Sequence, residues 1–291
     1  MNSLSQERKG ELILLIEIII WSTLPIISKF SFLGVSPIIS ASISSLLAGV
    51  FFLFIFIYQK RWHELKNNFD WKNIILLSIA LTITFAFLFT GTKDTTAGNT
   101  AILSQLEVFF TFLVISIIFR KEKIFYHHVI GAAFMILGVI IIYYSKNFSL
   151  NLGDIFVIIS VFFGAFCSLF AKKALEKTSV ISVMMARSFL LGIFLFILAI
   201  IFKQTPTFQE FKISFPFLLL NSFLIFGVSR TLMYKVFTLI PVTKAISLKA
   251  IYPLFTLIFS YFLLAEIPTI WQVMSIIPFF IGTFLLTRKN N

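Results

Sequence analysis

The sequence has 291 residues, of which 59% are hydrophobic and 12% are charged, with 24 basic against 12 acidic side chains. A water-soluble domain carries about 25% charged residues, so the composition excludes a soluble protein and predicts a surface that faces lipid. The basic residues lie in short patches between apolar runs, which is typical of membrane proteins and does not indicate nucleic-acid binding. The lone Cys167 excludes a disulfide framework and a thiol pair for redox or metal chemistry.

Ten apolar runs are long enough to cross a bilayer, which takes about 20 residues. In chain order they cover roughly 11–33, 37–58, 72–92, 96–119, 126–144, 153–172, 180–202, 214–234, 244–264 and 269–287. No small-residue cleavage site follows the first run, so we expect a retained span and not a signal peptide. The connections are short, and no water-soluble domain fits between the runs. The predicted fold class is therefore all-α, an integral membrane protein with ten transmembrane helices.

The distribution of Lys and Arg predicts which side of the membrane holds the termini. With a cytoplasmic N terminus, sixteen of these residues fall in inner segments and four in outer loops, namely Lys93, Lys146, Lys203 and Lys212. Cytoplasmic loops of membrane proteins carry an excess of basic residues, and an odd number of spans would remove the asymmetry. We expect a bacterial-type inner membrane, with both termini cytoplasmic.

Matched landmarks indicate that the chain is an internal repeat. Gly10 precedes Lys29 by nineteen residues, as Gly153 precedes Lys172. Glu122 precedes Gly138 by sixteen residues, as Glu266 precedes Gly282. These pairings give offsets of 143 and 144, and the second also aligns Ala101 with Ala245, Ile102 with Ile246 and Ser116 with Ser260. We therefore predict two repeats, residues 1–147 and 148–291.

Five spans in each repeat are an odd number, so the second repeat enters the membrane from the opposite side. Inverted repeats are the architecture of carriers that alternate access to a site near the middle of the bilayer. The sequence thus predicts two inverted five-helix repeats and a transport function.

Three segments carry a resemblance to a known family. They read "IIWSTLPIISKF" in the first span, "AGNTAILSQLEVFFTFLVISIIFRKEKIFYHHVIGAAFMILGVIII" in the fourth and fifth, and "PVTKAISLKAIYPLFTLIFSYFLLAEIPTIWQVMSIIPFFIGTFLL" in the ninth and tenth. The motifs that carry the resemblance are a Trp and a Lys in span one, small residues at the start of spans four and nine, and an acid in the short turn before spans five and ten. The chain resembles the drug/metabolite transporter superfamily, specifically its ten-span type with two EamA repeats.

The sequence also departs from that pattern. The family often has Gly before the acid of the short turns, where this chain has Lys121 and Ala265. Pro253 matches the usual proline of span nine, but its mirror in span four is Phe109. The resemblance implies export of amino acids or other small metabolites, and related members exchange sugar phosphates or nucleotide-like compounds.

Six ionisable residues fall within the predicted spans: Glu17, Lys29, Glu107, Arg187, Arg230 and Lys249. A charge at the centre of a membrane helix costs about 2.5–3.5 kcal/mol on insertion scales. These side chains must therefore face each other, water or a substrate. We expect Lys29 to extend its ammonium to the outer interface. We expect Arg187 to be structural, paired with an acid or reaching the inner headgroups.

Span one carries three residues on one helix face. Glu17 and Trp21 are four residues apart, and Pro25 continues the face and predicts a hinge beside a cavity. Desolvation raises the pKa of a carboxylate, so Glu17 is a candidate for proton coupling. It also resembles the first-span Glu of the small multidrug resistance proteins. The alternative is an acid that merely pairs with a basic neighbour near the interface.

The repeat offset pairs Gln105 in span four with Lys249 in span nine, so the two can face each other. Tyr252 and Pro253, a second predicted hinge, follow Lys249 within one turn. The expected cavity is lined by Glu17, Trp21, Gln105, Glu107, Arg230, Lys249 and Tyr252. All but Glu17 are predicted substrate-binding residues, and Glu107 is a second candidate for proton coupling. The alternative for each one alone is an interhelical hydrogen bond or ion pair.

Two acids against four bases within the spans favour a zwitterion such as an amino acid, because both signs are needed to bind it. An anionic or nucleotide-like metabolite fits nearly as well, and a multidrug exporter is a further alternative. The three histidines, His63, His127 and His128, lie in or beside loops and form no metal or catalytic motif. An intramembrane enzyme or a scaffold is therefore disfavoured. We expect no cofactor or metal, a small-molecule substrate and the lipid bilayer as partners, and a monomer or homodimer.

Overall fold

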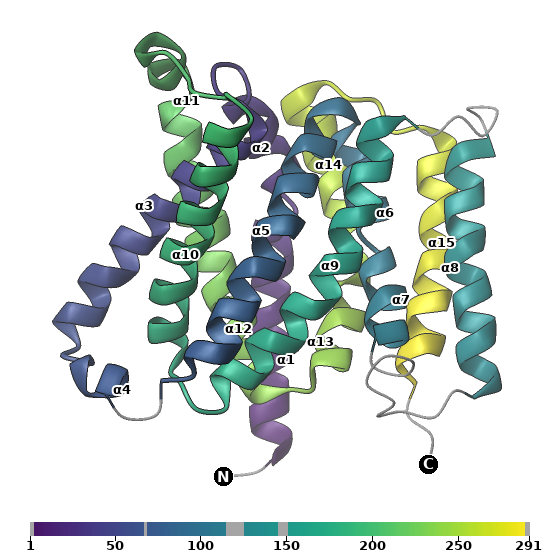
Figure 1. The fold of residues 1–291 in the computed structure, drawn as a ribbon. Helices are drawn as coiled ribbons and strands as arrows, with labels where there is room; N and C mark the ends of the chain where they lie inside the picture. The colour runs from purple at the N-terminus through teal and green to yellow at the C-terminus, as the bar shows by residue number, and fades with distance from the viewer. Residues whose placement is uncertain (1–2, 67–68, 115–124, 145–150, 289–291) are drawn as a thin grey trace.

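A computed structural model describes residues 3–66, 69–114, 125–144 and 151–288, and every regular element in these ranges is helical. The elements, labelled in Figure 1 where space allows, are α1 (Ser3–Trp21), α2 (Leu24–Ser31), α3 (Pro37–Tyr58), α4 (Trp62–Lys66), α5 (Trp71–Asp94), α6 (Ala97–Leu103), α7 (Leu106–Leu113), α8 (Tyr126–Tyr144), α9 (Leu152–Leu175), α10 (Val180–Ile201), α11 (Phe208–Leu220), η2 (Asn221–Ser229), α12 (Arg230–Leu239), α13 (Val242–Leu248), η3 (Lys249–Ile251), α14 (Tyr252–Leu264) and α15 (Ile270–Thr287).

Nine helical stretches within the described ranges are long and apolar enough to cross a membrane. They correspond to nine of the ten predicted spans, although the eighth is longer than expected and covers Phe208–Leu239. The remaining prediction, residues 96–119, coincides with α6 and α7, and its last residues lie outside the described ranges. Ser116, Lys121 and Glu122, used in the repeat and family comparisons, also lie outside them.

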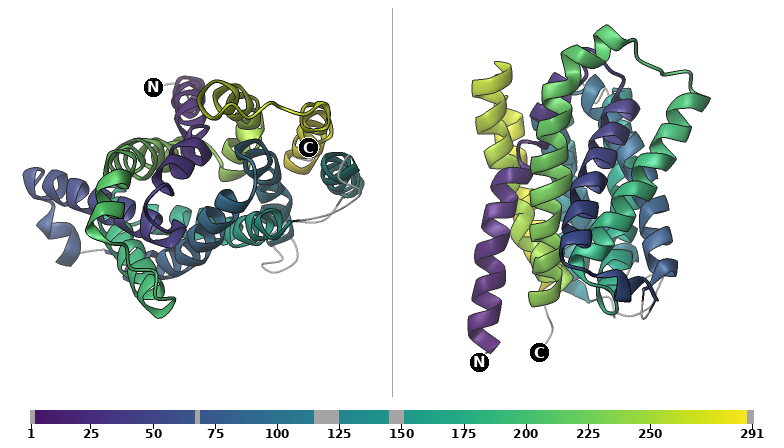
Figure 2. Two further views of the ribbon diagram at one scale, coloured as in Figure 1. Left: turned by 90° about the horizontal axis from the view of Figure 1, so that it is seen from above. Right: turned by 90° about the vertical axis from the view of Figure 1, so that its left-hand side faces the viewer.

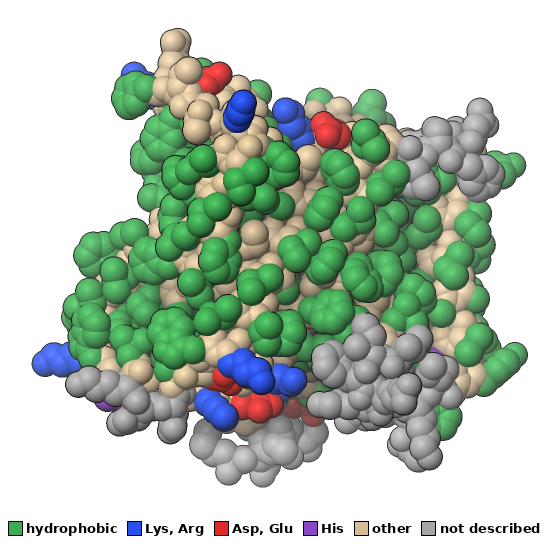
Figure 3. Space-filling view, in the orientation of Figure 1, with side chains coloured by type: hydrophobic (Ala, Val, Ile, Leu, Met, Phe, Trp, Pro, Cys, Tyr) green, Lys and Arg blue, Asp and Glu red, His purple; other side chains and the backbone are tan. Residues whose placement is uncertain are grey.

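The helices stand side by side and run alternately up and down. In Figure 1, α1 and α2 run upward from the N terminus and α9 runs downward, while both termini lie at the lower end. The pair α8 and α15 stands at one side of the bundle in the view from above (Figure 2). On the face drawn in Figure 3, hydrophobic side chains cover the middle and charged ones gather at the two ends, as a lipid-facing surface requires.

Small residues bring several helices into close contact. On α3, Ser42 donates a hydrogen bond to the Gly192 carbonyl of α10 (2.8 Å), and Ser45 donates to the Ser188 carbonyl (2.9 Å). A Cβ on Gly91 of α5 would lie 2.6 Å from the carbonyl oxygen of Gly153 in α9, so only glycine permits this approach. Packing of small residues and interhelical hydrogen bonds hold helices together where lipid removes the hydrophobic drive.

Three of the expected spans are interrupted within their length. The first breaks at Ser22–Thr23, the fourth at Ser104–Gln105, and the ninth at η3. The predicted hinge residues Pro25 and Pro253 both stand in the first turn of the helix that follows a break, where proline is tolerated because that N–H has no partner within the helix. The breaks at Gln105 and Lys249 are separated by the repeat offset of 144 residues.

Ion pairs join the ends of the helices. At the upper end, Lys29 lies 3.2 Å from Glu266, which also accepts a hydrogen bond from the Ala97 backbone N–H at the start of α6 (2.8 Å). Lys29 was expected to extend its ammonium to the outer interface, and the ion pair adds a partner that the sequence did not predict. At the lower end, Lys244 lies 2.6 Å from both Glu7 and Glu11. These pairs tie the two ends of the first span to other parts of the bundle.

Glu64 of α4 binds the start of α10 at the lower end. Its carboxylate accepts hydrogen bonds from Ser182 (2.6 Å) and Ser179 (2.7 Å) and pairs with Arg61 (2.6 Å). Partial burial opposes its ionisation, but the hydrogen bonds from Ser182 and Ser179 and the pair with Arg61 outweigh burial, so the pKa of Glu64 lies below its usual value.

Candidate functional site

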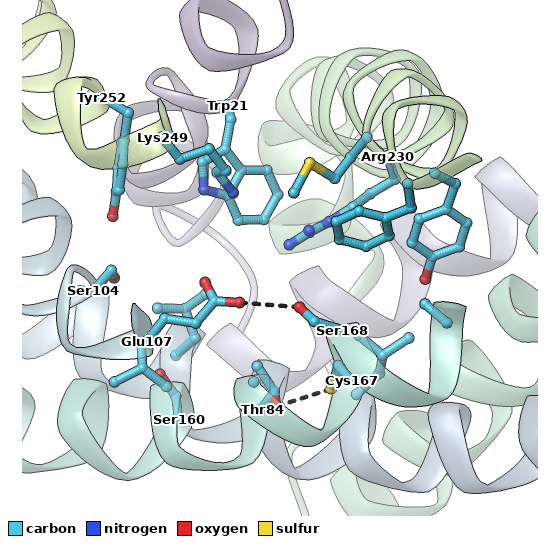
Figure 4. A pocket seen from close by; sticks show the side chains of 18 residues that line it. Trp21, Thr84, Ser104, Glu107, Ser160, Cys167, Ser168, Arg230, Lys249 and Tyr252 are labelled. Atoms are coloured by element: carbon cyan, nitrogen blue, oxygen red, sulfur yellow. Dashed lines mark hydrogen bonds between the residues drawn. The ribbon is translucent and has the colours of Figure 1, made fainter. Parts of the chain in front are cut away.

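A polar cavity of about 60 Å³ lies at the centre of the bundle, where the broken helices meet α5, α9 and α12. This volume has room for on the order of two water molecules at the density of the liquid. Figure 4 shows the eighteen residues that line it. Five of the predicted site residues are among them: Trp21, Glu107, Arg230, Lys249 and Tyr252. Gln105 and Glu17 do not line it.

Two cations share one aromatic ring in the cavity. The guanidinium carbon of Arg230 lies 3.6 Å from the centroid of the Trp21 ring, and the Lys249 ammonium lies 5.0 Å from it. Arg230 begins α12, and Lys249 stands at the break of span nine. A desolvated cation–π contact is worth about 2 kcal/mol or more, so Trp21 holds both cations within the membrane without neutralising either.

Glu107, in the first turn of α7, is the one acidic side chain among the described lining residues. Its Oε1 accepts a hydrogen bond from Ser168 of α9 (3.3 Å, Figure 4). Within the described part of the chain, no ion pair involves Glu107, Arg230 or Lys249. The lining thus presents two positive charges and one negative charge that no described side chain neutralises.

Tyr252 belongs to the segment where spans one and nine cross. Its side chain points toward Ser104 in Figure 4. Its backbone carbonyl accepts a hydrogen bond from Ser22 (3.2 Å), in the break of span one. Thr256, one turn further along α14, donates in return to the Ser22 carbonyl (3.0 Å). The two breaks are therefore joined directly by hydrogen bonds.

Gln105 lies behind the cavity wall. Its side chain is 3% exposed, and its Nε2 donates a hydrogen bond to the backbone carbonyl of Ala250 (3.1 Å). Sequence reasoning placed Gln105 opposite Lys249, and the structure brings it to the residue next to Lys249. The Gln105 amide therefore contacts the backbone of the other half of the chain and does not face the cavity.

Glu17 is fully buried one turn before Trp21. Its Oε1 accepts a hydrogen bond from Ser229 (3.0 Å), the residue before Arg230, and its Oε2 has no hydrogen-bond partner among the described residues. The shared helix face predicted for Glu17 and Trp21 does not bring Glu17 to the cavity, because the cavity ends at Trp21.

Arg187 is also fully buried and lies outside the lining. Its Nη2 donates to the Phe226 carbonyl (3.2 Å), and its guanidinium carbon lies 5.3 Å from the Tyr234 ring centroid. Phe226 belongs to η2, a nine-residue π-helical stretch. The prediction that Arg187 pairs with an acid or a lipid headgroup is therefore wrong. In the described structure, Arg187 donates a hydrogen bond to a main-chain carbonyl.

Sequence reasoning missed the contribution of α9 and α5 to the site. Ser160, Gly164, Ser168 and Ala171 are small residues spaced three or four apart, and they form the α9 wall of the cavity. This spacing places them on one helix face, a signal that the sequence did contain. Thr84 of α5 contacts Cys167 in the same wall, 3.5 Å from oxygen to sulfur. Among the described residues, no group of three His, Cys, Asp or Glu side chains could hold a metal ion.

Comparison with known protein families decides the class of this protein. The model of the EamA-like transporter family matches residues 8–144 and again residues 151–288. The chain belongs to the EamA-like transporter family. It is thus a multi-pass membrane transporter of the drug/metabolite transporter superfamily, which confirms the resemblance seen in the sequence.

Two relatives of this EamA-like chain are also named as transporters. An uncharacterized transporter of Methanothermobacter thermautotrophicus is 27% identical, over 92% of this chain and 86% of its own length. One from Archaeoglobus fulgidus is 26% identical, over 97% and 99%. A solved crystal structure superposes with a TM-score of 0.70, at 12% identity and 96% coverage of both chains, which shows a shared fold alone.

Proposed function

We propose that this EamA-like transporter is a secondary carrier that exports or exchanges amino acids or related small zwitterionic metabolites. The observation that carries the proposal is the central cavity with two cations and one acid, none of them in an ion pair with a described residue. Charges at membrane depth are costly and mark substrate or ion pathways. A zwitterion can pair its carboxylate with the two cations and its ammonium with the acid.

The placement of the charges suggests how such a ligand binds. Its carboxylate would lie between Arg230 and Lys249, where a guanidinium can donate two parallel hydrogen bonds and an ammonium adds a point charge. Its ammonium would face Glu107, which already accepts a weak hydrogen bond from Ser168. The ring of Tyr252, in the same lining, offers an apolar surface to the side chain of the ligand.

A second candidate is an anionic metabolite, and one observation favours it. The described lining carries two bases against one acid, so a ligand with a net negative charge would balance the site. Arg230 and Lys249 both suit a phosphate as well as a carboxylate. In this alternative, Glu107 binds no cationic group of the ligand.

The transport mechanism we propose is alternating access between two inverted five-helix repeats, residues 1–147 and 148–291. The tenth span would be α6 and α7 together with the residues that follow them. The opposite directions of α1 and α9 support the inversion, and the breaks at Gln105 and Lys249 support the repeat. Broken helices at the interface of inverted repeats form the substrate sites of many carriers.

We further propose that both termini are cytoplasmic in a bacterial-type inner membrane. Both lie at the lower end in Figure 1, which supports the even number of spans. Proton coupling through Glu17 or Glu107 is part of the proposal. The Oε2 of the buried Glu17, which has no hydrogen-bond partner in the described part of the chain, supports a proton-binding role there. Flux that is independent of pH in proteoliposomes would reject this coupling.

Counterflow in proteoliposomes tests the proposed function. Vesicles loaded in turn with each of the twenty amino acids receive the same compound in radiolabelled form outside. Parallel vesicles receive the matching amine without a carboxylate or the matching acid without an amine. We expect accumulation of an amino acid and at least tenfold less of either partial compound. Equal accumulation of the deaminated acid would favour the anionic alternative, and no accumulation of either would reject both.

A further inference from the structure

One side chain joins the two matching helix breaks. Gln105 directly precedes α7, and its Nε2 donates a hydrogen bond to the Ala250 carbonyl within η3, at 3.1 Å. Both residues are buried, with 3% and 4% exposed surface. The bond links residues 145 positions apart in the chain, one in each half of the family match.

This bond is near, along the chain, to the groups of opposite charge in the cavity. Glu107 is two residues after Gln105, in the first turn of α7, and Lys249 is the residue before Ala250. The backbone that carries the acid is thus tied to the backbone that carries the cation. Local backbone hydrogen bonds continue through both breaks, among them Ser104 N–H to the Thr100 carbonyl (3.1 Å) and Glu107 N–H to the Ser104 carbonyl (3.1 Å). Each break is thus a tightened turn, and the Gln105 bond adds a constraint between the two breaks.

The other side of η3 is held by span one. Ser22 donates to the Tyr252 carbonyl at 3.2 Å, and Thr256 donates to the Ser22 carbonyl at 3.0 Å. With Ser22 on one side and Gln105 on the other, η3 has contacts with both broken helices that face it. The Gln105 contact reaches the residue directly before the helix that carries Glu107.

We propose that Gln105 is a positioning residue that sets the separation between Glu107 and Lys249, and thereby the length of the zwitterion that the site accepts. The proposal rests on the proposed function for its specificity part. The separation itself is a property of the protein and is measurable without any substrate.

The test of position uses thiol cross-linking. Cys167 is the one cysteine of the chain, so Cys167→Ser gives a cysteine-free background. Glu107→Cys and Lys249→Cys are added, and the pair is treated with a short and a long bifunctional methanethiosulfonate. Gln105→Met then removes the donor at nearly constant volume, and Gln105→Leu serves as a second variant. Monodisperse elution confirms that each protein is folded.

A matched control is available at Gln272. It is also buried (8% exposed), and its Nε2 donates to Asn99 Oδ1 at 2.8 Å, but it does not line the central cavity. Gln272→Met therefore removes a buried carboxamide donor at a position that the proposal does not involve.

With Gln105 present, we expect one spacer length to dominate the cross-linked product. In Gln105→Met or Gln105→Leu the ratio of the two products should change by roughly three- to tenfold, the factor expected for one hydrogen bond. Gln272→Met should leave the ratio unchanged. An unchanged ratio in both Gln105 variants, or an equal change in Gln272→Met, would overturn the positioning role.

Specificity is then measured in the chain with Glu107, Lys249 and Cys167 intact. The probes are alanine, β-alanine and γ-aminobutyrate, which differ in the distance between amine and carboxylate, as competitors in counterflow. We expect Gln105→Met to compress the spread of their inhibition constants by roughly three- to tenfold. A cross-linking change without competition by any probe would reject the zwitterion and retain the positioning role. A spread that is unchanged despite altered cross-linking would reject the specificity part.

Discussion

Neutralising Glu107 is expected to weaken the binding of an amino acid far more than the binding of its deaminated analogue. Glu107→Gln keeps the shape of the side chain and leaves the contact with Ser168 available. No described cation pairs with Glu107, so the substitution breaks no internal ion pair. The loss therefore falls on the ammonium of the ligand.

The magnitude follows from the charges involved. A carboxylate and an ammonium 4 Å apart attract by about 4 kcal/mol at an effective dielectric constant of 20, and truncating one partner of a buried pair costs about 2–5 kcal/mol. A loss of about 2–4 kcal/mol corresponds to roughly a 30- to 1,000-fold weaker binding constant. A ligand without an ammonium should lose less than about threefold.

Inhibition constants from counterflow competition measure both losses, with one amino acid and its deaminated acid as competitors. Glu64→Gln is the control, because Glu64 lies at the lower end of the bundle and does not line the cavity. It should leave both constants nearly unchanged at a fixed pH. Equal losses for the two competitors in Glu107→Gln, or a larger loss in Glu64→Gln, would refute the role given to Glu107.

Three further predictions concern the ring, the packing and the lower end. Trp21→Leu removes both cation–π contacts and should raise the KM for the transported compound about tenfold. Trp21→Phe keeps an aromatic ring and should raise the KM by less. Equal KM values for the two variants would contradict the role of the ring. Gly91→Ala should lower the free energy of unfolding by about 1–3 kcal/mol, because the added Cβ would lie 2.6 Å from a carbonyl oxygen. Gly164→Ala is the control and should leave Tm unchanged, because its Cβ would be 3.9 Å from the nearest atom. A larger loss of stability in Gly164→Ala than in Gly91→Ala would contradict the packing. The lowered pKa of Glu64 means that its ionised carboxylate stabilises the fold at pH values above the ordinary glutamate pKa of about 4.3, and that this contribution is lost as pH falls through the lower pKa of the folded state. The difference in Tm between the unmodified protein and Glu64→Gln should therefore be present at pH 7 and vanish below the folded-state pKa. A difference that stays constant with pH would contradict this prediction.

Hydropathy and residue spacing predicted most of the helices, because a span must satisfy its backbone within itself and cover it with apolar side chains. The breaks were signalled only in part. Pro25 and Pro253 marked two of them, but the break at Gln105 contains no proline and became visible only as the repeat partner of Lys249. A π-helical stretch such as η2 has no proline signal either, so the carbonyl partner of Arg187 was not foreseeable.

For the site, the cost of burying charge correctly directed attention to Glu107, Arg230 and Lys249, which line one cavity. Helical spacing tells which residues share a face, but not where along that face a cavity ends. This is why Glu17 lies against Ser229 and outside the cavity that Trp21 lines. The partner of Gln105 depends on contact between the two halves, which spacing within one helix does not contain.

Cys167 provides the most direct measurement of whether this cavity is the place where cargo binds. It is the chain's one cysteine and lies in the α9 wall, so the unmodified protein needs no background substitution. A small uncharged methanethiosulfonate should modify it in proteoliposomes, and a saturating mixture of the twenty amino acids should slow the reaction at least about threefold. If the mixture supports counterflow yet leaves the rate of Cys167 modification unchanged, the cargo binds elsewhere and the account is contradicted.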